Sequence, residues 1–113
     1  MKMPKSSRSE LVPGTLDMLV LYTLTLGALH GYAIAQHIEK LSDSVLQVEQ
    51  GSLYPALERL QRKGWLTSDW GQTPTGRRAR YYTITASGRK QLGEEISNFD
   101  RAMLAINRVM KRA

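Results

Sequence analysis

Eight basic side chains lie between residues 51 and 90, and they dominate the chemistry that this sequence offers. They are Arg59, Arg62, Lys63, Arg77, Arg78, Arg80, Arg89 and Lys90. Only two acidic residues, Glu58 and Asp69, lie in the same segment, which therefore carries a net charge of +6. A basic patch on a small domain is the electrostatic feature that attracts polyanions such as nucleic acids. Charge alone is equally compatible with a solvated basic surface.

Residue types that perform catalysis or bind metal are sparse. The chain has no cysteine, which excludes disulfides, thiolate metal sites and a cysteine nucleophile. Its two histidines, His30 and His37, are seven residues apart without a metal-binding motif. We interpret both as ordinary surface or interhelical residues. No glycine-rich loop matches a phosphate-binding fingerprint. The sequence therefore predicts no catalytic residue, no metal site and no cofactor, and a protein that is not an enzyme.

The stretch "GSLYPALERLQRKGWL", residues 51–66, has the period of an amphipathic helix. Leu53, Leu57 and Leu60 are spaced at i, i+4 and i+7, which predicts a stripe that packs in the core. The remaining face carries the proline and three charged side chains. They are Pro55, Glu58, Arg59 and Arg62.

Ser52 predicts how this helix begins. Serine is a preferred N-cap, and with Ser52 as the cap Pro55 becomes the third helical residue. N–H groups of the first turn have no acceptor within the helix, so a proline there loses no hydrogen bond. Free N–H groups, a positive dipole, the Ser52 hydroxyl and the Tyr54 phenol together suit a phosphate group. The alternative is a capped surface helix with Tyr54 packed on its neighbour.

The segments "WLTSDW" and "RARYYTI" alternate in polarity around the loop "GQTPTGRR", which predicts a β-hairpin. We expect Arg78 and Arg80 to share one face of their strand and Arg77 to lie at the loop end. Arginine suits phosphate oxygens and narrow minor grooves. A solvated hairpin tip is the alternative. Tyr81 and Tyr82 point to opposite faces, and the pattern leaves open which one lies in the core.

The other elements complete a recognisable order. A nearly all-apolar helix from Thr15 to about Leu26 is expected at the centre, and a second helix from about Tyr32 to Leu41 follows it. Helix, helix, helix, hairpin and long helix make a mainly α fold with a small β-hairpin, that is, a winged helix-turn-helix with a long C-terminal helix. In such a fold the helix that begins near Ser52 enters the major groove, and the wing reaches the neighbouring backbone.

The last helix, expected to start at Thr85, carries a seam of large apolar residues. The seam consists of Leu92, Ile96, Phe99, Met103, Ile106 and Met110. Spacings of 4, 3, 4, 3 and 4 residues make a heptad pattern. A helix of about 27 residues is roughly 40 Å long, too long for a domain of this size to cover alone. We therefore expect the seam to form a homodimer. Packing against the first helix of the same chain is the alternative.

Composition along the chain gives the expected boundaries and compartment. We expect a disordered tail at residues 1–9, a winged helix-turn-helix domain at 10–85 and a dimerisation helix at 86–113. The longest apolar stretch has only about 13 residues before His30, too few to span a bilayer, which needs about 20. The N-terminal residues lack the apolar core of a secretory signal. The expected compartment is the cytoplasm, with no membrane partner.

Three segments resemble a known family. "HGYAIAQHIEKL", "GSLYPALERLQRKGWL" and "RRARYYTITASGRKQL" are similar to the PadR family of bacterial transcriptional regulators, in particular its small members with a single C-terminal helix. The resemblance covers about residues 11–112. It implies a dimeric, operator-binding repressor, with Ser52 to Pro55 beginning the recognition helix and Arg77, Arg78 and Arg80 in the wing. The loop "GQTPTGRR" departs from the Asn-containing loop of close relatives, so the resemblance implies no operator preference.

Together these observations predict a sequence-specific DNA-binding transcriptional regulator, a homodimeric repressor of a palindromic operator in double-stranded DNA. The predicted DNA contacts are Ser52, Tyr54, Pro55, Arg59, Arg62, Arg77, Arg78 and Arg80. One alternative is a protein-interaction module that uses its long helix to bind a different protein. A third hypothesis adds a small aromatic effector, flanked by Trp65 and Trp70 at a dimer interface, that releases DNA. Packing at the root of the wing is the simpler interpretation of both tryptophans.

Overall fold

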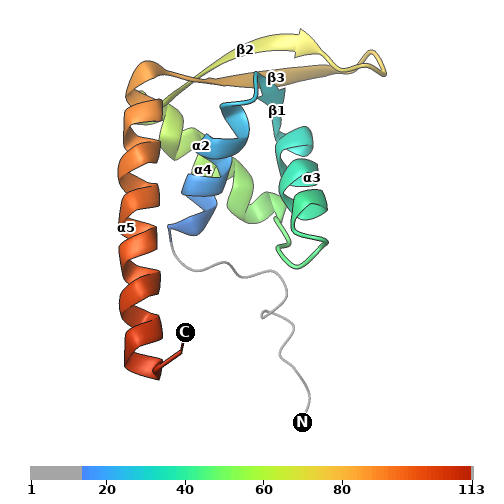
Figure 1. Ribbon diagram of the computed structural model, residues 1–113. Helices are drawn as coiled ribbons and strands as arrows, with labels where there is room; N and C mark the ends of the chain where they lie inside the picture. Colours follow the sequence, from blue (N-terminus) through green and yellow to red (C-terminus); the bar gives the residue numbers. More distant parts are fainter. Residues whose placement is uncertain (1–13, 113) are drawn as a thin grey trace.

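The computed structural model describes residues 14–112 and shows a helical body capped by a small sheet (Figure 1). The expected tail at 1–9 lies outside the described residues, as does the start of the segment 10–85. The elements are α2 (Thr15–Leu24), β1 (Leu29–His30), α3 (Gly31–Leu41), α4 (Gln50–Arg62), β2 (Leu66–Gln72), β3 (Arg78–Ile84) and α5 (Ala86–Met110). The predicted mainly α fold with a hairpin and a long last helix is confirmed.

Helix α2 lies at the centre of the body, as its apolar sequence predicts. It contacts α3, α4 and α5, and Val20, Leu21 and Leu24 are almost completely buried. Thr23 is the one polar side chain of α2 that is buried. Its hydroxyl donates to the Leu19 carbonyl at 2.7 Å. Because that hydroxyl is satisfied within the helix, it costs little inside the core. The helix ends two residues earlier than expected.

The sheet has three antiparallel strands in the order β1–β3–β2. Strands β2 and β3 form the predicted hairpin, with Leu66 opposite Ile84 and Gln72 opposite Arg78. Strand β1 was not predicted, because two residues are too short to show any period. It pairs Leu29 with Tyr82 and thereby ties the wing to the helical body.

The tyrosine that the sequence left undecided is Tyr82, which is 7% exposed and belongs to the core. Its neighbour Tyr81 lies on the other face of β3, where its ring meets His30 edge-on with 5.3 Å between centroids. His30 also caps α3, because its Nδ1 accepts a hydrogen bond from the Ala33 N–H at 3.3 Å. The interpretation of His30 as an ordinary surface or interhelical residue therefore missed a capping role.

Helix α4 carries the predicted core stripe, since Leu53, Leu57 and Leu60 are all at most 1% exposed. The predicted start at Ser52 is wrong: the N-cap is Glu49 and the helix begins at Gln50. The preceding backbone explains the earlier start, because Val48 is buried and its N–H donates to Glu39 Oε2 at 2.9 Å. The chain is thus fixed just before Glu49 and turns into the helix there.

This earlier start changes the position of Pro55. It lies in the second turn of α4, where a residue with an N–H would donate to the carbonyl of Gly51. That carbonyl therefore has no i+4 donor from its own helix. It lies on the solvent-facing side of α4, where both Gly51 and Pro55 are exposed. Water can satisfy it there, which makes an interior proline tolerable.

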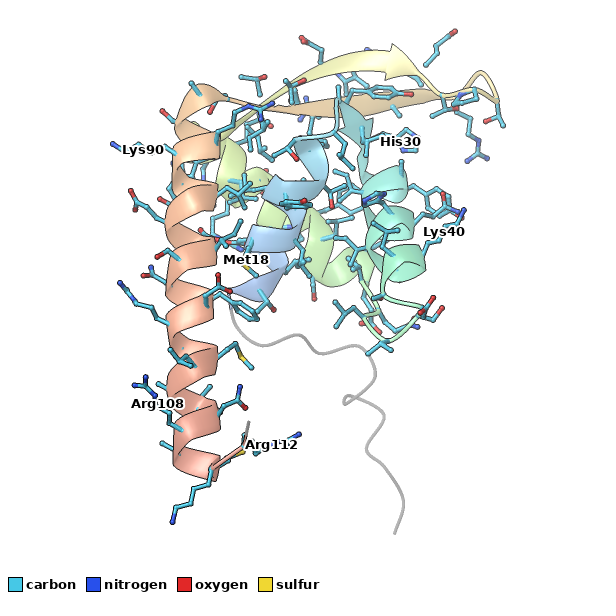
Figure 2. All side chains as sticks on the ribbon, viewed as in Figure 1. Met18, His30, Lys40, Lys90, Arg108 and Arg112 are labelled. Atoms are coloured by element: carbon cyan, nitrogen blue, oxygen red, sulfur yellow. The ribbon has the colours of Figure 1, made fainter. Side chains whose placement is uncertain are left out.

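Helix α5 begins as predicted after Thr85, whose hydroxyl accepts from the Gly88 N–H at 3.0 Å and donates to the Gly64 carbonyl at 2.7 Å. Gly88 is required for close packing, because a Cβ there would lie 2.2 Å from the carbonyl oxygen of Trp65. The helix then runs along α2 and extends past the rest of the body (Figures 1 and 2).

The apolar seam of α5 divides into two parts. Leu92 is 6% exposed and Ile96 packs against the same core, so the alternative of packing within the chain holds for this first part. Phe99, Met103, Ile106 and Met110 remain 38% to 51% exposed. The second part of the seam therefore has no sufficient cover within residues 14–112. None of the described helices is long and apolar enough to cross a membrane.

Candidate nucleic-acid interface

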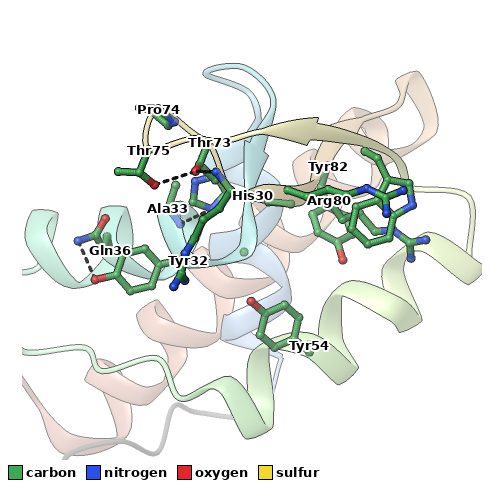
Figure 3. A pocket seen from close by; sticks show the side chains of 15 residues that line it. His30, Tyr32, Ala33, Gln36, Tyr54, Thr73, Pro74, Thr75, Arg80 and Tyr82 are labelled. Atoms are coloured by element: carbon green, nitrogen blue, oxygen red, sulfur yellow. Dashed lines mark hydrogen bonds between the residues drawn. The ribbon is translucent and has the colours of Figure 1, made fainter.

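A groove of about 940 Å³ lies between the start of α3, the start of α4 and the wing (Figure 3). Aromatic rings and guanidinium groups dominate its lining. The principal residues are Tyr32, Tyr54, Trp70, Arg77, Arg78 and Arg80. Three elements that are separate in sequence thus bring all three predicted wing contacts and one predicted helix contact, Tyr54, to a single concave surface.

Tyr54 points from α4 toward the strand that carries Arg80 and Tyr82 (Figure 3). Its ring lies against Gly31, where a Cβ would meet the phenol oxygen at 2.8 Å. Tyr54 therefore packs on its neighbour, as the alternative interpretation held, yet it remains 44% exposed and lines the groove. The phenol end of the ring packs on Gly31, and the side chain as a whole remains partly exposed in the groove.

Ser52 and Pro55 are exposed on α4 but do not line this groove. With Gly51, which is also exposed, they lie in the first two turns of the helix. Nothing lies within 4 Å of the position that a Gly51 Cβ would take. Because α4 begins at Gln50, the N–H groups of Ser52 and Leu53 donate to the Glu49 carbonyl at 3.0 and 2.9 Å. The free N–H groups that the sequence predicted here for a phosphate are therefore already used.

Arg59 and Arg62 differ in their surroundings. Arg59 forms an ion pair with Asp17 of α2, with 2.6 Å between Nη2 and Oδ1, and the Asp17 side chain is only 17% exposed. This guanidinium faces the helical body and its charge is compensated. Arg62 lies 3.7 Å from Glu58, and both side chains are largely exposed. Exposed pairs of this kind contribute little and separate easily.

The wing places its arginines as the strand pattern predicts. Arg78 and Arg80 share one face of β3, and both guanidinium groups lie over the Trp70 ring, at 4.3 and 5.0 Å from its centroid. Arg77 precedes the strand in the turn. Its carbonyl accepts from the Thr73 N–H at 2.7 Å, and this bond closes the turn.

Tyr82 forms the back of the groove behind Arg80. Burial raises the pKa of its phenol, and the positive charge of Arg80 offsets part of that rise. The phenol is therefore uncharged at neutral pH. On the α3 side of the groove, Tyr32 accepts a hydrogen bond from the Gln36 amide at 3.3 Å (Figure 3). Neither Tyr32 nor Gln36 was predicted at the site, because one exposed turn of α3 has no distinguishing sequence signal.

The two tryptophans occupy different places. Trp65 packs against the core at the root of the wing, and its carbonyl accepts from the Thr85 N–H at 3.0 Å. Trp70 is 56% exposed and lines the groove. Trp65 is not among the residues that line this groove. The interpretation that both tryptophans pack at the root of the wing therefore fits Trp65 but not Trp70.

The family model of the PadR-like transcriptional regulators matches residues 20–94, which include α3, α4 and the whole wing. The chain belongs to the PadR-like family. The match spans the groove and the first part of α5. It confirms the resemblance carried by the helix start at 51–57 and by the arginine-rich strand.

Solved structures share the fold over most of this PadR-like protein. A transcriptional regulator from Clostridium thermocellum is 28% identical with a TM-score of 0.78, covering 84% of this chain and 92% of that one. A PadR family regulator from Eggerthella lenta is 29% identical with a TM-score of 0.73, covering 88% and 85%. A PadR-like regulator from Bacillus cereus is 25% identical with a TM-score of 0.73, covering 88% and 95%.

Membership of this family gives the general function. PadR-like proteins are DNA-binding transcription regulators without enzymatic activity, and this chain is one of them. The prediction that the protein is not an enzyme is thereby confirmed. Among residues 14–112 no group of three or more His, Asp or Glu side chains is arranged to hold a metal ion.

Proposed function

We propose that this PadR-like regulator is a homodimeric repressor that binds a palindromic operator, with the start of α4 in the major groove and the wing on the adjacent backbone. The observation that carries the proposal is the groove itself. It joins the start of α4 to the three arginines of the wing, with Tyr54 on one side and Arg77, Arg78 and Arg80 on the other.

The α4 contacts follow from its exposed surface. Ser52 and Pro55 face solvent in the first two turns of the helix, the end with which recognition helices contact bases and phosphates. Tyr54 offers a fixed phenol to a phosphate oxygen, and Arg62 can leave its weak pair with Glu58 for the DNA backbone. Arg59 we assign to positioning, because its ion pair with Asp17 holds α4 on α2.

The wing is the second DNA-binding element of the proposal, and its arginines contact the phosphates. Among the described residues, neither Arg78 nor Arg80 has an acidic partner within salt-bridge distance. Their charges are therefore available to phosphates. Each phosphate that such a charge neutralises releases counterions, so binding should weaken as salt rises.

The exposed part of the α5 seam supports the proposed dimer. Phe99, Met103, Ile106 and Met110 are half exposed, so a two-fold dimer buries the remainder of eight side chains. At about 1.5–3 kcal/mol for complete burial of each, half burial gives roughly 6–12 kcal/mol. This is comparable with association costs of about 4–15 kcal/mol. The exposed Leu104 and Val109 extend the apolar surface beyond the seam.

A repressor that is released by a small molecule is a second candidate. The groove contains four tyrosine and tryptophan side chains, Tyr32, Tyr54, Trp70 and Tyr82, on the surface that we assign to DNA. A planar aromatic effector bound there would compete with the duplex. Quenching of Trp70 emission by such a compound, in a Trp65→Phe background, together with loss of DNA binding, would support this candidate. Unchanged emission and DNA binding across a panel of planar aromatic compounds would count against it.

The experiment that tests the main proposal measures DNA affinity at several salt concentrations. Replacing Arg77, Arg78 and Arg80 by alanine should weaken binding to all duplexes. The slope of log K against log salt should decrease by up to about 3 per protomer if each arginine meets a phosphate. A matched control replaces Arg89, Lys90 and Arg101 of α5, which removes the same charge away from the groove. An unchanged slope in the wing variant, or an equal decrease in the control, would contradict the assignment.

A further inference from the structure

We propose that Trp70 is a positioning residue for DNA binding: its indole ring holds the guanidinium groups of Arg78 and Arg80 at the groove in an orientation ready for phosphate. The inference rests on the proposed role of the wing. It adds a residue that carries no charge and that neither the helix pattern nor the arginine cluster identifies.

The register of the hairpin places the three side chains together. Trp70 on β2 is directly opposite Arg80 on β3, and Arg78 is the diagonal neighbour on the same face. Cross-strand and diagonal neighbours are within reach of a large aromatic ring. The guanidinium carbons lie 4.3 and 5.0 Å from the ring centroid, inside the range of cation–π attraction.

Packing in the core does not explain Trp70. The side chain is 56% exposed and is absent from the apolar cluster that includes Trp65. An exposed indole on a two-stranded extension gains little from burial. Its close charged neighbours are the two arginines, so orientation of those arginines is the role that its surroundings support.

An aromatic ring orients an arginine without cancelling its charge. Arg59 shows the other way of fixing such a side chain, through a carboxylate that compensates the positive charge. A wing built to bind phosphate needs the charge to remain. Arginine also loses considerable rotamer freedom when it binds, and a ring that already limits those rotamers reduces the loss.

The opposite face of the wing supplies a rigid base for this arrangement. Tyr81 lies over Gly71, where a Cβ would be 3.0 Å from the ring, and its hydroxyl donates to the Gln72 carbonyl at 2.9 Å. The two strands are thus braced on the face away from Trp70. Loss of the indole should therefore leave the hairpin folded.

The test is a double-mutant cycle on affinity for a labelled duplex of random sequence. Trp70→Leu should lower affinity about threefold to tenfold while the salt slope stays unchanged, because no charge is removed. Trp70→Phe, which keeps an aromatic face, should retain most of the affinity. In a background with both Arg78→Ala and Arg80→Ala, Trp70→Leu should have no further effect. Circular dichroism of each variant checks that the fold is kept.

The outcomes separate the inference from the function on which it rests. If Trp70→Leu lowers affinity by the same factor in the double-alanine background, the indole contacts DNA itself and the positioning role is wrong. If Trp70→Leu and Trp70→Phe both leave affinity unchanged, the ring does not matter and the role is equally wrong. If instead the double-alanine variant keeps the affinity and the salt slope of the parent protein, the wing does not bind phosphate and the proposed function fails.

Discussion

Helices α4 and α5 are both amphipathic, and both bury a stripe of leucine or isoleucine against α2, but the faces that they leave exposed differ in chemistry. The exposed face of α4 carries small, polar and charged side chains such as Ser52, Pro55 and Arg62. The exposed part of the α5 seam carries Phe99 and Met103. The first surface suits a hydrated, charged duplex, and the second suits another apolar surface.

This difference shows that a helical period predicts an apolar face but not whether that face packs within the protomer or against a partner. The stripe on α4 ends where the protomer's own core ends, since Leu53, Leu57 and Leu60 are all buried. The seam on α5 continues beyond the core after Ile96. A continuous heptad pattern therefore serves two purposes on one helix, folding at its start and, as we propose, assembly toward its end.

The largest expected effect comes from breaking the exposed seam. Met103→Glu in both chains of a dimer places two carboxylates in the interface, and burying unpaired charges costs several kcal/mol. The dimer dissociation constant should rise on the order of 10³-fold, and binding to a palindromic duplex should weaken with it. Sedimentation equilibrium at micromolar concentration should show monomer.

Ala105→Glu is the control for that change. It adds the same charge to α5 at an exposed position outside the heptad seam. It should leave the dimer intact. If Met103→Glu and the control behave alike, the exposed seam is not the assembly surface. A different protein as partner of the long helix would be favoured if the parent chain is itself monomeric.

A change in the buried part of the seam should affect folding instead. Leu92→Ala removes a side chain that is 6% exposed and should cost about 2–5 kcal/mol of unfolding free energy. Urea denaturation in the monomeric Met103→Glu background isolates this effect from dimerisation. Leu104→Ala, at a residue that is 55% exposed, should change stability by no more than about 0.5 kcal/mol. Equal losses of unfolding free energy in the two variants would contradict the division of α5 into a buried first part and an exposed second part.

On α4 the comparison predicts an effect on DNA affinity without an effect on stability. Tyr54→Phe removes only the phenol oxygen at the groove surface, so affinity should decrease by about tenfold or less. Thermal stability should be unchanged, because the ring still packs on Gly31. Tyr22→Phe, at an exposed position on α2, is the matched control and should alter neither quantity. Lower stability with unaltered affinity would make Tyr54 a packing residue alone.

The smallest expected effect concerns two glycines of α5. Nothing lies within 4 Å of a Cβ placed on Gly93, so Gly93→Ala should stabilise the helix by about 0.5–1 kcal/mol. Gly88→Ala should destabilise, because its Cβ would lie 2.2 Å from the Trp65 carbonyl oxygen. Thermal denaturation of both variants measures the opposite signs. A stable Gly88→Ala variant would show that α5 is not held tightly against the root of the wing.

Long periodic segments were predictable from the sequence, and features fixed by a few contacts were not. The α4 stripe, the hairpin and the reach of α5 follow from periods of 3.6, 2 and 3.5 residues. The start of α4 does not, because Glu39 and the buried Val48 fix it from outside the helix. Ser52 looked like a cap since its residue type favours caps, and tertiary contact overrode that local preference.

The site was predictable in its residue types and less so in its arrangement. The three wing arginines and Tyr54 meet at one groove, as the charge pattern and the helix start suggested. Arg59 is directed to Asp17, a residue 42 positions earlier, and no local pattern indicates a pair so distant in the sequence. The contact of Trp70 with two arginines depends on the hairpin register, which the strand pattern alone leaves undetermined.

Selection of bound duplexes from a random pool by the intact protein tests the central claim most directly. A homodimer that inserts the starts of two α4 helices should enrich an inverted repeat, with half-site centres about 10–10.5 base pairs apart or a multiple of that spacing. The same pool offered to Met103→Glu should yield much weaker enrichment of that repeat. Enrichment of a single unpaired site, or no enrichment of any sequence by the intact protein, would contradict a dimeric repressor of a palindromic operator.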